Sequence, residues 1–289
     1  MRLFLANRAG GSAQKGANMA HLNDDLLVIT DLDGTLLDPN THEWEPAQSW
    51  LARLTDHQVP VILSSTKTAA EIIAIQDALG LSGQPFIAEN GAIIQLDAAW
   101  EDSPDFPRLL NGVPHDDILA VINRLRNEHG YKLFCFSDVD EKTIAEWTGF
   151  SPKLAAMAKL LEASETVIWR DSDENLARFT ASLEALGLMM IEGGRFWHVL
   201  DARGGKGQAV NWLKEQYRKR EGKLRTTLGL GDGPDDASLL DNVDLAVVVK
   251  GLSRQGVMLK HDDPDRVYRT TESGPAGFRE GLDHFLDKA

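Results

Sequence analysis

Short apolar runs alternate with helical patterns near the start of the chain. The run LLVIT at 26–30 is followed by apolar residues at helical spacing over 45–58, and the run at 59–65 by a second helical pattern over 68–80. Because nearly continuous apolar strands are typical of sheets buried on both faces, this order predicts a parallel sheet covered by helices. The same rhythm returns from residue 204 onward. We therefore expect an α/β fold with a Rossmann-like parallel-sheet core.

The middle of the chain has a different pattern. Residues 97–114 contain three prolines and few regular features, so we expect a loop region there. Strand and helix patterns beyond it alternate without a tight rhythm, which favours an inserted α+β domain. The predicted organisation is a flexible arm at 1–22, a core at 23–100 and 192–289, and an inserted domain at 101–191.

Composition and charge limit the classes of partner. The 289 residues carry a formal net charge of −14, which makes nucleic acid and anionic membranes unsuitable partners. Cys135 is the only cysteine, so an intrachain disulfide is excluded, and no apolar run has the length of a membrane span. We expect a cytoplasmic protein, a monomer or weak homodimer, that acts on a small molecule.

Polar residues follow the apolar runs that should form the central strands. Because the carboxyl ends of parallel strands meet at one edge of the sheet, we expect these side chains to lie together. They are Asp31, Asp33 and Gly34 after the first run, Ser65, Thr66 and Lys67 after the second, Lys206 after the run at 195–201, and Asp232, Asp235 and Asp236 after the run at 226–231.

Phosphoryl transfer is the chemistry that suits this set. Mg²⁺ prefers oxygen ligands, which Asp31 and Asp232 can supply, and a bound cation would offset the repulsion between neighbouring carboxylates. A carboxylate can attack phosphorus, and Asp33 could protonate the leaving oxygen and later deprotonate water. Lys206 and Ser65 could hold the phosphoryl oxygens, and Gly34 would let the backbone approach them.

Structural interpretations compete with these assignments. Asp31 and Asp33 could be helix N-caps, and Ser65 could cap the helix at 68–80. Asp236 could be an acidic residue in the first turn of a helix that interacts favourably with the helix dipole. Lys206 taken alone could be a solvated lysine. Arg170 and Asp171 could form a structural pair, and His198 alternates within a strand, as a core or edge residue does.

The motifs together resemble a known group of enzymes. The stretches DLDGTLLD, LSSTK and GLGDGPDD, with Lys206, resemble the four motifs of the haloacid dehalogenase superfamily of phosphohydrolases, and the inserted domain resembles its C2-type cap. The stretches SSTKT, IAENGAIIQL, WRDSDE, RFWHVLDARGGKGQA and GLGDGPDDA resemble the mannosyl-3-phosphoglycerate phosphatases more closely, over about residues 25–285.

The resemblance implies a role for each matching residue. Asp31 would be the nucleophile and a Mg²⁺ ligand, Asp33 the general acid/base and a ligand through its carbonyl, and Asp232 the third protein ligand. Ser65 and Lys206 would hold the phosphoryl group, and Asp236 would support the metal site. Members usually carry Asn where this chain has Asp235, which bears on the substrate. The expected substrate contacts are Gly34, Thr66, Lys67, Glu89, Asn90, Arg170 and Asp235.

Three functions follow as hypotheses. The first is a Mg²⁺-dependent phosphomonoesterase that converts mannosyl-3-phosphoglycerate to mannosylglycerate and phosphate through an aspartyl-phosphate intermediate. The second keeps this mechanism but uses another sugar phosphate. The third is a sensor that binds a sugar phosphate without catalysis, although a sensor has no need for both a nucleophile and an acid.

Overall fold

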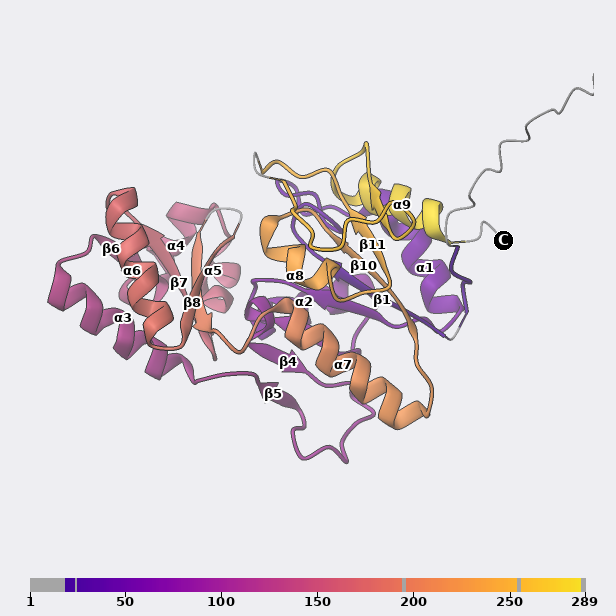
Figure 1. Ribbon diagram of the computed structural model, residues 1–289, viewed down its shortest axis with the longest axis horizontal. Helices are drawn as coiled ribbons and strands as arrows, with labels where there is room; N and C mark the ends of the chain where they lie inside the picture. Colours follow the sequence, from indigo (N-terminus) through magenta and orange to yellow (C-terminus); the bar gives the residue numbers. More distant parts are fainter. Residues whose placement is uncertain (1–18, 24, 194–195, 254–255, 287–289) are drawn as a thin grey trace, which may run out of the picture.

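A computed structural model of the protein describes residues 19–23, 25–193, 196–253 and 256–286. Two sheets, each covered by helices, form two units that lie side by side (Figure 1). We call the unit built on the eight-stranded sheet the core, and the unit built on the four-stranded sheet, residues 115–201, the cap. The predicted α/β fold with a parallel-sheet core is confirmed.

The core sheet has the strand order β12-β11-β10-β1-β2-β3-β4-β5. Neighbours are parallel from β12 to β3, whereas β4 and β5 are antiparallel additions at one edge. The strands are β1 (Leu26–Asp31), β2 (Val61–Ser64), β3 (Phe86–Ala88), β4 (Ile93–Gln95), β5 (Arg108–Leu110), β10 (Thr226–Gly231), β11 (Leu245–Val248) and β12 (Val267–Arg269).

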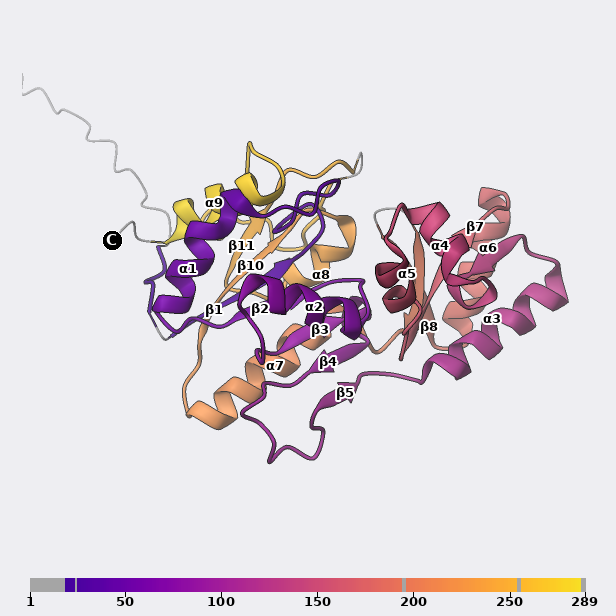
Figure 2. The ribbon, with the colours of Figure 1, turned by 180° about the vertical axis from the view of Figure 1, so that it is seen from behind.

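Both faces of this sheet are buried, as the continuous apolar runs predict. In β1, Leu26 and Val28 pack into one hydrophobic cluster, and Leu27 and Ile29 into another on the opposite face. The first face is covered by α1 (Gln48–Asp56), α2 (Ala69–Leu79) and α9 (Gly274–Phe285), and the second by α7 (Lys206–Glu221) and α8 (Ala237–Leu240). Figure 1 shows α7 in front of the sheet, and Figure 2 shows α1 and α2 in front. Short 3₁₀ turns η1 (Glu45–Ala47), η2 (Glu89–Gly91) and η4 (Pro234–Asp236) complete the core.

The cap sheet is antiparallel, with the order β6-β7-β9-β8. Its strands are β6 (Leu133–Cys135), β7 (Ser164–Trp169), β8 (Leu188–Glu192) and β9 (Trp197–Asp201). Helices α3 (His115–His129) and α6 (Asp173–Ala185) share one hydrophobic cluster with the sheet, and α4 (Glu141–Thr148) and α5 (Pro152–Ala158) share another, together with the turn η3 (Phe136–Asp138).

The boundaries between core and cap, as strand pairing gives them, differ from those of the predicted inserted domain at 101–191. Residues 108–110, expected within a loop, form β5 and pair with β4, so the core continues beyond residue 100. Residues 197–201, expected in the core, form β9 between β7 and β8 of the cap sheet. Three- to five-residue strands carry too weak a periodicity to show which sheet they join, because partners far along the chain decide it.

The expected arm at 1–22 lies outside the described residues up to residue 18. The end of that segment is ordered, since Ala20 is buried and its N–H donates to the carbonyl of Phe285 at 2.9 Å. Leu22 packs against the core cluster beside α9. Within the described part of the chain, we find no helix with the length and apolar character needed to cross a membrane.

Candidate active site

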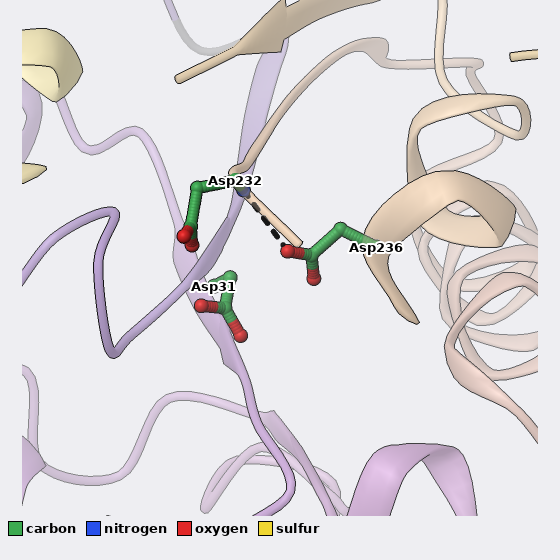
Figure 3. A group of neighbouring side chains, drawn as sticks. All are labelled: Asp31, Asp232 and Asp236. Carbon is green, nitrogen blue, oxygen red and sulfur yellow. Dashed lines mark hydrogen bonds between the residues drawn. The ribbon is translucent and has the colours of Figure 1, made fainter. Parts of the chain in front are cut away.

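Three aspartates from different segments converge at the carboxyl edge of the core sheet. Asp31 ends β1, Asp232 follows β10, and Asp236 ends η4. One oxygen from each lies within 4.8 Å of the others, and Figure 3 shows the three side chains grouped at the end of the strands. The arrangement follows from the parallel pairing of β1 with β10, which brings the two strand ends side by side.

Lys206 lies beneath these carboxylates at the start of α7. Its side chain is fully buried, and its Nζ donates to Asp31 at 2.9 Å, to Asp235 at 2.9 Å and to Asp236 at 2.6 Å. The turn η2 packs against the residue before it: a Cβ built on Gly91 would lie 2.1 Å from the carbonyl carbon of Gly205. Only glycine fits this contact, which helps to fix the position of the lysine.

Burial and mutual repulsion favour the protonated form of the clustered acids. Burial raises the pKa of Asp31 well above its usual range, and Asp236 raises it further, whereas Lys206 opposes the shift. For Asp232, burial followed by the charge of Asp236 raises the pKa to about 7. Burial also lowers the pKa of Lys206, but Asp235, Asp236 and Asp31 together outweigh it and raise the pKa overall. The lysine is therefore charged, whereas the crowded acids bind protons more tightly than free carboxylates do.

This donor set fits a hard divalent cation. Three carboxylates offer oxygen atoms close enough to share one ion, which is the chemistry that Mg²⁺ requires. A side-chain hydroxyl holds one of them in place and backbone N–H groups hold another. Thr35 donates its hydroxyl to Asp232 at 2.9 Å, and the N–H groups of Asp232 and Gly233 both donate to Asp236 at 3.0 Å. Asp31 and Asp232 are thus the residues that could hold the ion through their side chains, with Asp236, whose two oxygens already accept hydrogen bonds, beside them.

The backbone conformation of residue 34 and its close contact with Asp232 explain why the first motif contains a glycine there. Its φ is +90°, and a Cβ built there would lie 2.6 Å from a carboxylate oxygen of Asp232. Gly34 lines the cavity, which is consistent with the expected contact between its backbone and a phosphate. The group that leaves no room for a side chain at this position, however, is the carboxylate of Asp232. Any larger side chain would push Asp232 away from Asp31.

Asp33 and Lys67 form a second ion pair at the cavity. The Nζ of Lys67 donates to Oδ2 of Asp33 at 2.5 Å, and the lysine side chain is only 12% exposed. Oδ1 of Asp33 accepts no hydrogen bond from the described residues. Ser65 lies nearby, at the end of β2, and its hydroxyl accepts from the N–H of Lys67 at 3.2 Å. Asp33 thus has Oδ2 fixed by Lys67, whereas its Oδ1 is buried 3.9 Å from Nε2 of His42.

One cavity of about 760 Å³ connects these groups with the cap. Its core wall includes the predicted residues Asp31, Asp33, Gly34, Ser65, Thr66, Lys67, Asp232, Asp235 and Asp236. Its cap wall includes Phe136, Phe150, Phe196, Thr166 and His198. Lys206 is too deeply buried to line the wall and reaches the site through its hydrogen bonds.

Three predicted substrate contacts lie elsewhere. Glu89 is buried against the cap, where its carboxylate accepts from the N–H groups of Glu162 at 2.8 Å and Ala163 at 2.9 Å and from the hydroxyl of Ser164 at 2.7 Å. It fastens the cap to the core and does not line the cavity.

Asn90 and Arg170 are also absent from the described cavity wall. Asn90 is 1% exposed in the turn η2, with a φ of +56°, and its amide atoms have no hydrogen-bond partner among the described residues. Arg170 is exposed beyond the end of β7, next to Lys132, whose carbonyl accepts its N–H. The motif positions alone do not reveal these locations, because they depend on how the cap docks.

His198 is the residue of the cavity wall that sequence reasoning undervalued. It was expected in the core or at an edge, and it is 8% exposed, but it faces the cavity from β9. Burial lowers the pKa of His198 to about 4, so the imidazole is neutral near pH 7. Strand alternation alone assigns His198 to one face of β9. It does not show that this face of the cap sheet is turned toward the core unit.

Comparison with known proteins agrees with this architecture. Residues 28–255 match the family of haloacid dehalogenase-like hydrolases. The sucrose-phosphatase of Synechocystis sp. PCC6803, solved with sucrose and phosphate, is similar with a TM-score of 0.61 and 18% identity, covering 90% of this chain and 98% of that chain. BT1666, a phosphatase from Bacteroides thetaiotaomicron, gives a TM-score of 0.63 at 17% identity, over 96% and 99% of the two chains. The subclass IIB sugar phosphatase BT4131 gives a TM-score of 0.61 at 16% identity, covering 90% of this chain and 98% of that chain.

Proposed function

Because the chain belongs to the haloacid dehalogenase-like hydrolases, we propose that it is a Mg²⁺-dependent phosphomonoesterase that hydrolyses mannosyl-3-phosphoglycerate. The observation that carries the proposal is Asp31 at the cavity wall, bonded to buried Lys206 and next to Asp232 and Asp236. Asp31, Asp232 and Asp236 line one cavity, and the ammonium of Lys206 lies directly behind them, which supports a site for phosphoryl transfer.

Asp31 is the proposed nucleophile. The ammonium of Lys206 holds its Oδ1 at 2.9 Å and so fixes the orientation of the carboxylate toward the cavity. Attack of a carboxylate oxygen on phosphorus forms an aspartyl phosphate and releases the alcohol of the substrate. Water then attacks the phosphorus of this intermediate, which releases phosphate and restores Asp31.

Asp33 is the proposed general acid and base. Lys67 holds its Oδ2 at 2.5 Å, and the carboxyl group lines the cavity beside Asp31, where a leaving group would lie. Protonated Asp33 gives its proton to the leaving oxygen in the first step and takes one from water in the second. Ser65, in the same wall, offers a hydroxyl to the phosphoryl oxygens.

A bound Mg²⁺ would neutralise charge on the transferring phosphoryl group. Asp31 and Asp232, with the carbonyl of Asp33, are the proposed ligands, and Asp236 supports them through the N–H groups of Asp232 and Gly233. Without a cation, the ammonium of Lys206 pairs with Asp31, Asp235 and Asp236, and Asp232 adds a fourth acidic group beside them.

The cap wall supports a carbohydrate leaving group. The rings of Phe136, Phe150 and Phe196 offer apolar surface to the C–H face of a sugar, and Thr166 and neutral His198 offer hydrogen bonds to hydroxyls. The cavity volume of about 760 Å³ accommodates a glycosylated phosphoglycerate. The same wall would also accept another sugar phosphate, which is the second candidate.

Phosphate release from a panel of esters tests the proposal. Purified full-length protein with Mg²⁺ is expected to give its highest kcat/KM on mannosyl-3-phosphoglycerate, compared with hexose 6-phosphates, sucrose phosphate and 3-phosphoglycerate. Asp31→Asn should abolish turnover, whereas the matched variant Asp56→Asn, on the exposed end of α1, should keep it. A higher kcat/KM on another sugar phosphate would change the substrate that we assign but leave the proposed mechanism unchanged. Binding without turnover of any ester would indicate a sensor.

A further inference from the structure

Lys206 has more anionic partners than a phosphate-binding lysine can keep. An ammonium group has three N–H donors, and all three are used by Asp31, Asp235 and Asp236. An incoming phosphoryl group that is to accept a hydrogen bond from Lys206 must therefore displace one carboxylate. Which carboxylate gives way determines how tightly the site holds phosphate.

Two of the three carboxylates are fixed by other contacts. Asp236 has a side chain only 1% exposed, and it also accepts from the N–H groups of Asp232 and Gly233. Asp31 ends a central strand and belongs to the cation cluster. Displacing either of them would disturb the proposed metal site and the nucleophile itself.

Asp235 is the carboxylate that can move. Its side chain is 13% exposed, the most of the three, and it lines the cavity. Within the described segments, its only side-chain hydrogen bond is the one from Lys206. It lies on η4, a three-residue turn, and not within a strand of the sheet.

We propose that Asp235 competes with phosphate for Lys206 and thereby lowers the affinity of the site for phosphate. The carboxylate satisfies the lysine in the free protein, gives way when a phosphoryl group enters, and returns to help expel the inorganic phosphate produced. This inference rests on the proposed function, because it assumes that the cavity binds a phosphoryl group beside Lys206.

Replacing Asp235 by a neutral residue should tighten phosphate binding for two reasons. It removes a carboxylate that competes for Lys206, and it removes the repulsion between that carboxylate and the phosphate. Asp235→Asn keeps the size of the side chain but removes a negative charge close to the phosphate position, and a hydrogen bond from a neutral amide oxygen to Lys206 is weaker than one from a carboxylate. The Asn amide can also donate to a phosphate oxygen. A charge-assisted hydrogen bond contributes enough for us to expect phosphate to bind at least about tenfold more tightly.

Calorimetric titration of inorganic phosphate into full-length protein saturated with Mg²⁺ measures this directly. We expect Asp235→Asn to lower the Kd of phosphate at least about tenfold and to lower the inhibition constant of phosphate in the ester assay to the same degree. Asp235→Ser, which removes the carboxylate without adding an amide, should also tighten binding. It serves as the second variant if the asparagine protein does not fold.

Glu192→Gln is the matched control. Glu192 lines the same cavity from the cap strand β8, so this change removes one negative charge without touching Lys206. Its phosphate Kd should stay within about twofold of the wild-type value, because separated charges in a solvent-filled cavity are screened. An equal tightening in Glu192→Gln would show a general charge effect and would overturn the proposal.

The outcomes separate this inference from the proposed function. If the wild-type protein hydrolyses esters but both Asp235 variants bind phosphate no more tightly, the competition is refuted and the phosphatase stands. If the asparagine variant binds phosphate more tightly although no ester is turned over, the competition stands and the catalytic proposal fails. If neither protein binds phosphate or hydrolyses esters, both are refuted.

Discussion

Glu89→Gln should loosen the attachment of the cap to the core at one defined point. The carboxylate of Glu89 accepts three hydrogen bonds from the cap, through Oε1 from the N–H of Glu162, and through Oε2 from the N–H of Ala163 and the hydroxyl of Ser164. A glutamine amide has only one oxygen. Whichever way it turns, its NH₂ group faces one of the two backbone N–H donors, and that donor loses its acceptor.

The magnitude follows from this count. One buried N–H without an acceptor costs about 1–3 kcal/mol, and the remaining bonds lose the contribution of the negative charge. Burial raises the pKa of Glu89, which shows that the ionised carboxylate is already disfavoured there, so the neutral amide recovers part of this cost. We therefore expect a net loss of roughly 1–2 kcal/mol at the contact between Glu89 and the cap.

Hydrogen exchange of the full-length protein, followed by mass spectrometry, measures this locally. The amides of Glu162 and Ala163 should exchange about tenfold faster in Glu89→Gln than in wild type, since a tenfold change corresponds to about 1.4 kcal/mol. Glu174→Gln, which alters an exposed ion pair with Arg178 on the cap, is the matched control and should leave these amides unchanged. Unaltered exchange at Glu162 and Ala163 in Glu89→Gln would refute the reasoning.

Other predictions concern the acid cluster and its support. The raised pKa of Asp232, about 7, means that the folded metal-free protein binds a proton more tightly than the unfolded chain. This contribution to stability, at most about 4 kcal/mol, is complete below about pH 4 and is lost as the pH rises toward 7. Because Mg²⁺ competes with that proton, its effect on Tm should grow from pH 5 to pH 8, and a pH-independent effect would contradict the assignment. Lys206→Met leaves buried carboxylates without their cation and should lower the free energy of unfolding by about 3–5 kcal/mol in urea titrations without metal; an unchanged midpoint would contradict this. Gly91→Ala should cost at least about 2 kcal/mol more than Gly130→Ala, because both positions have positive φ but only Gly91 faces backbone at 2.1 Å. Equal losses would show that η2 can shift.

The sequence could predict the core of the site because topology determines it. Asp31, Ser65 and Asp232 follow strands that pair in parallel, so any sheet containing those strands brings them to one edge. Lys206 begins the helix after the last cap strand and reaches the same edge. The catalytic and metal-binding roles of these residues stay predictions, although their proximity is confirmed by the geometry.

The residues near the cap could not be predicted in the same way. Glu89 follows the core strand β3, as a site residue would, but the docked cap covers it and uses its carboxylate as an acceptor. His198 was assigned to one face of its strand, and only the docking of cap on core turns that face toward the cavity that Asp31 also lines. Strand alternation contains no information about the relative placement of two separate sheets.

Trapping the covalent intermediate tests the central claim most directly. The full-length protein would be mixed with Mg²⁺ and its best ester, quenched in acid during turnover, and digested for mass spectrometry. The account predicts one phosphoryl group on the peptide that contains Asp31, and none on that peptide in Asp31→Asn. Rapid release of phosphate with no phosphoryl group on Asp31, together with full activity of Asp31→Asn, would contradict it.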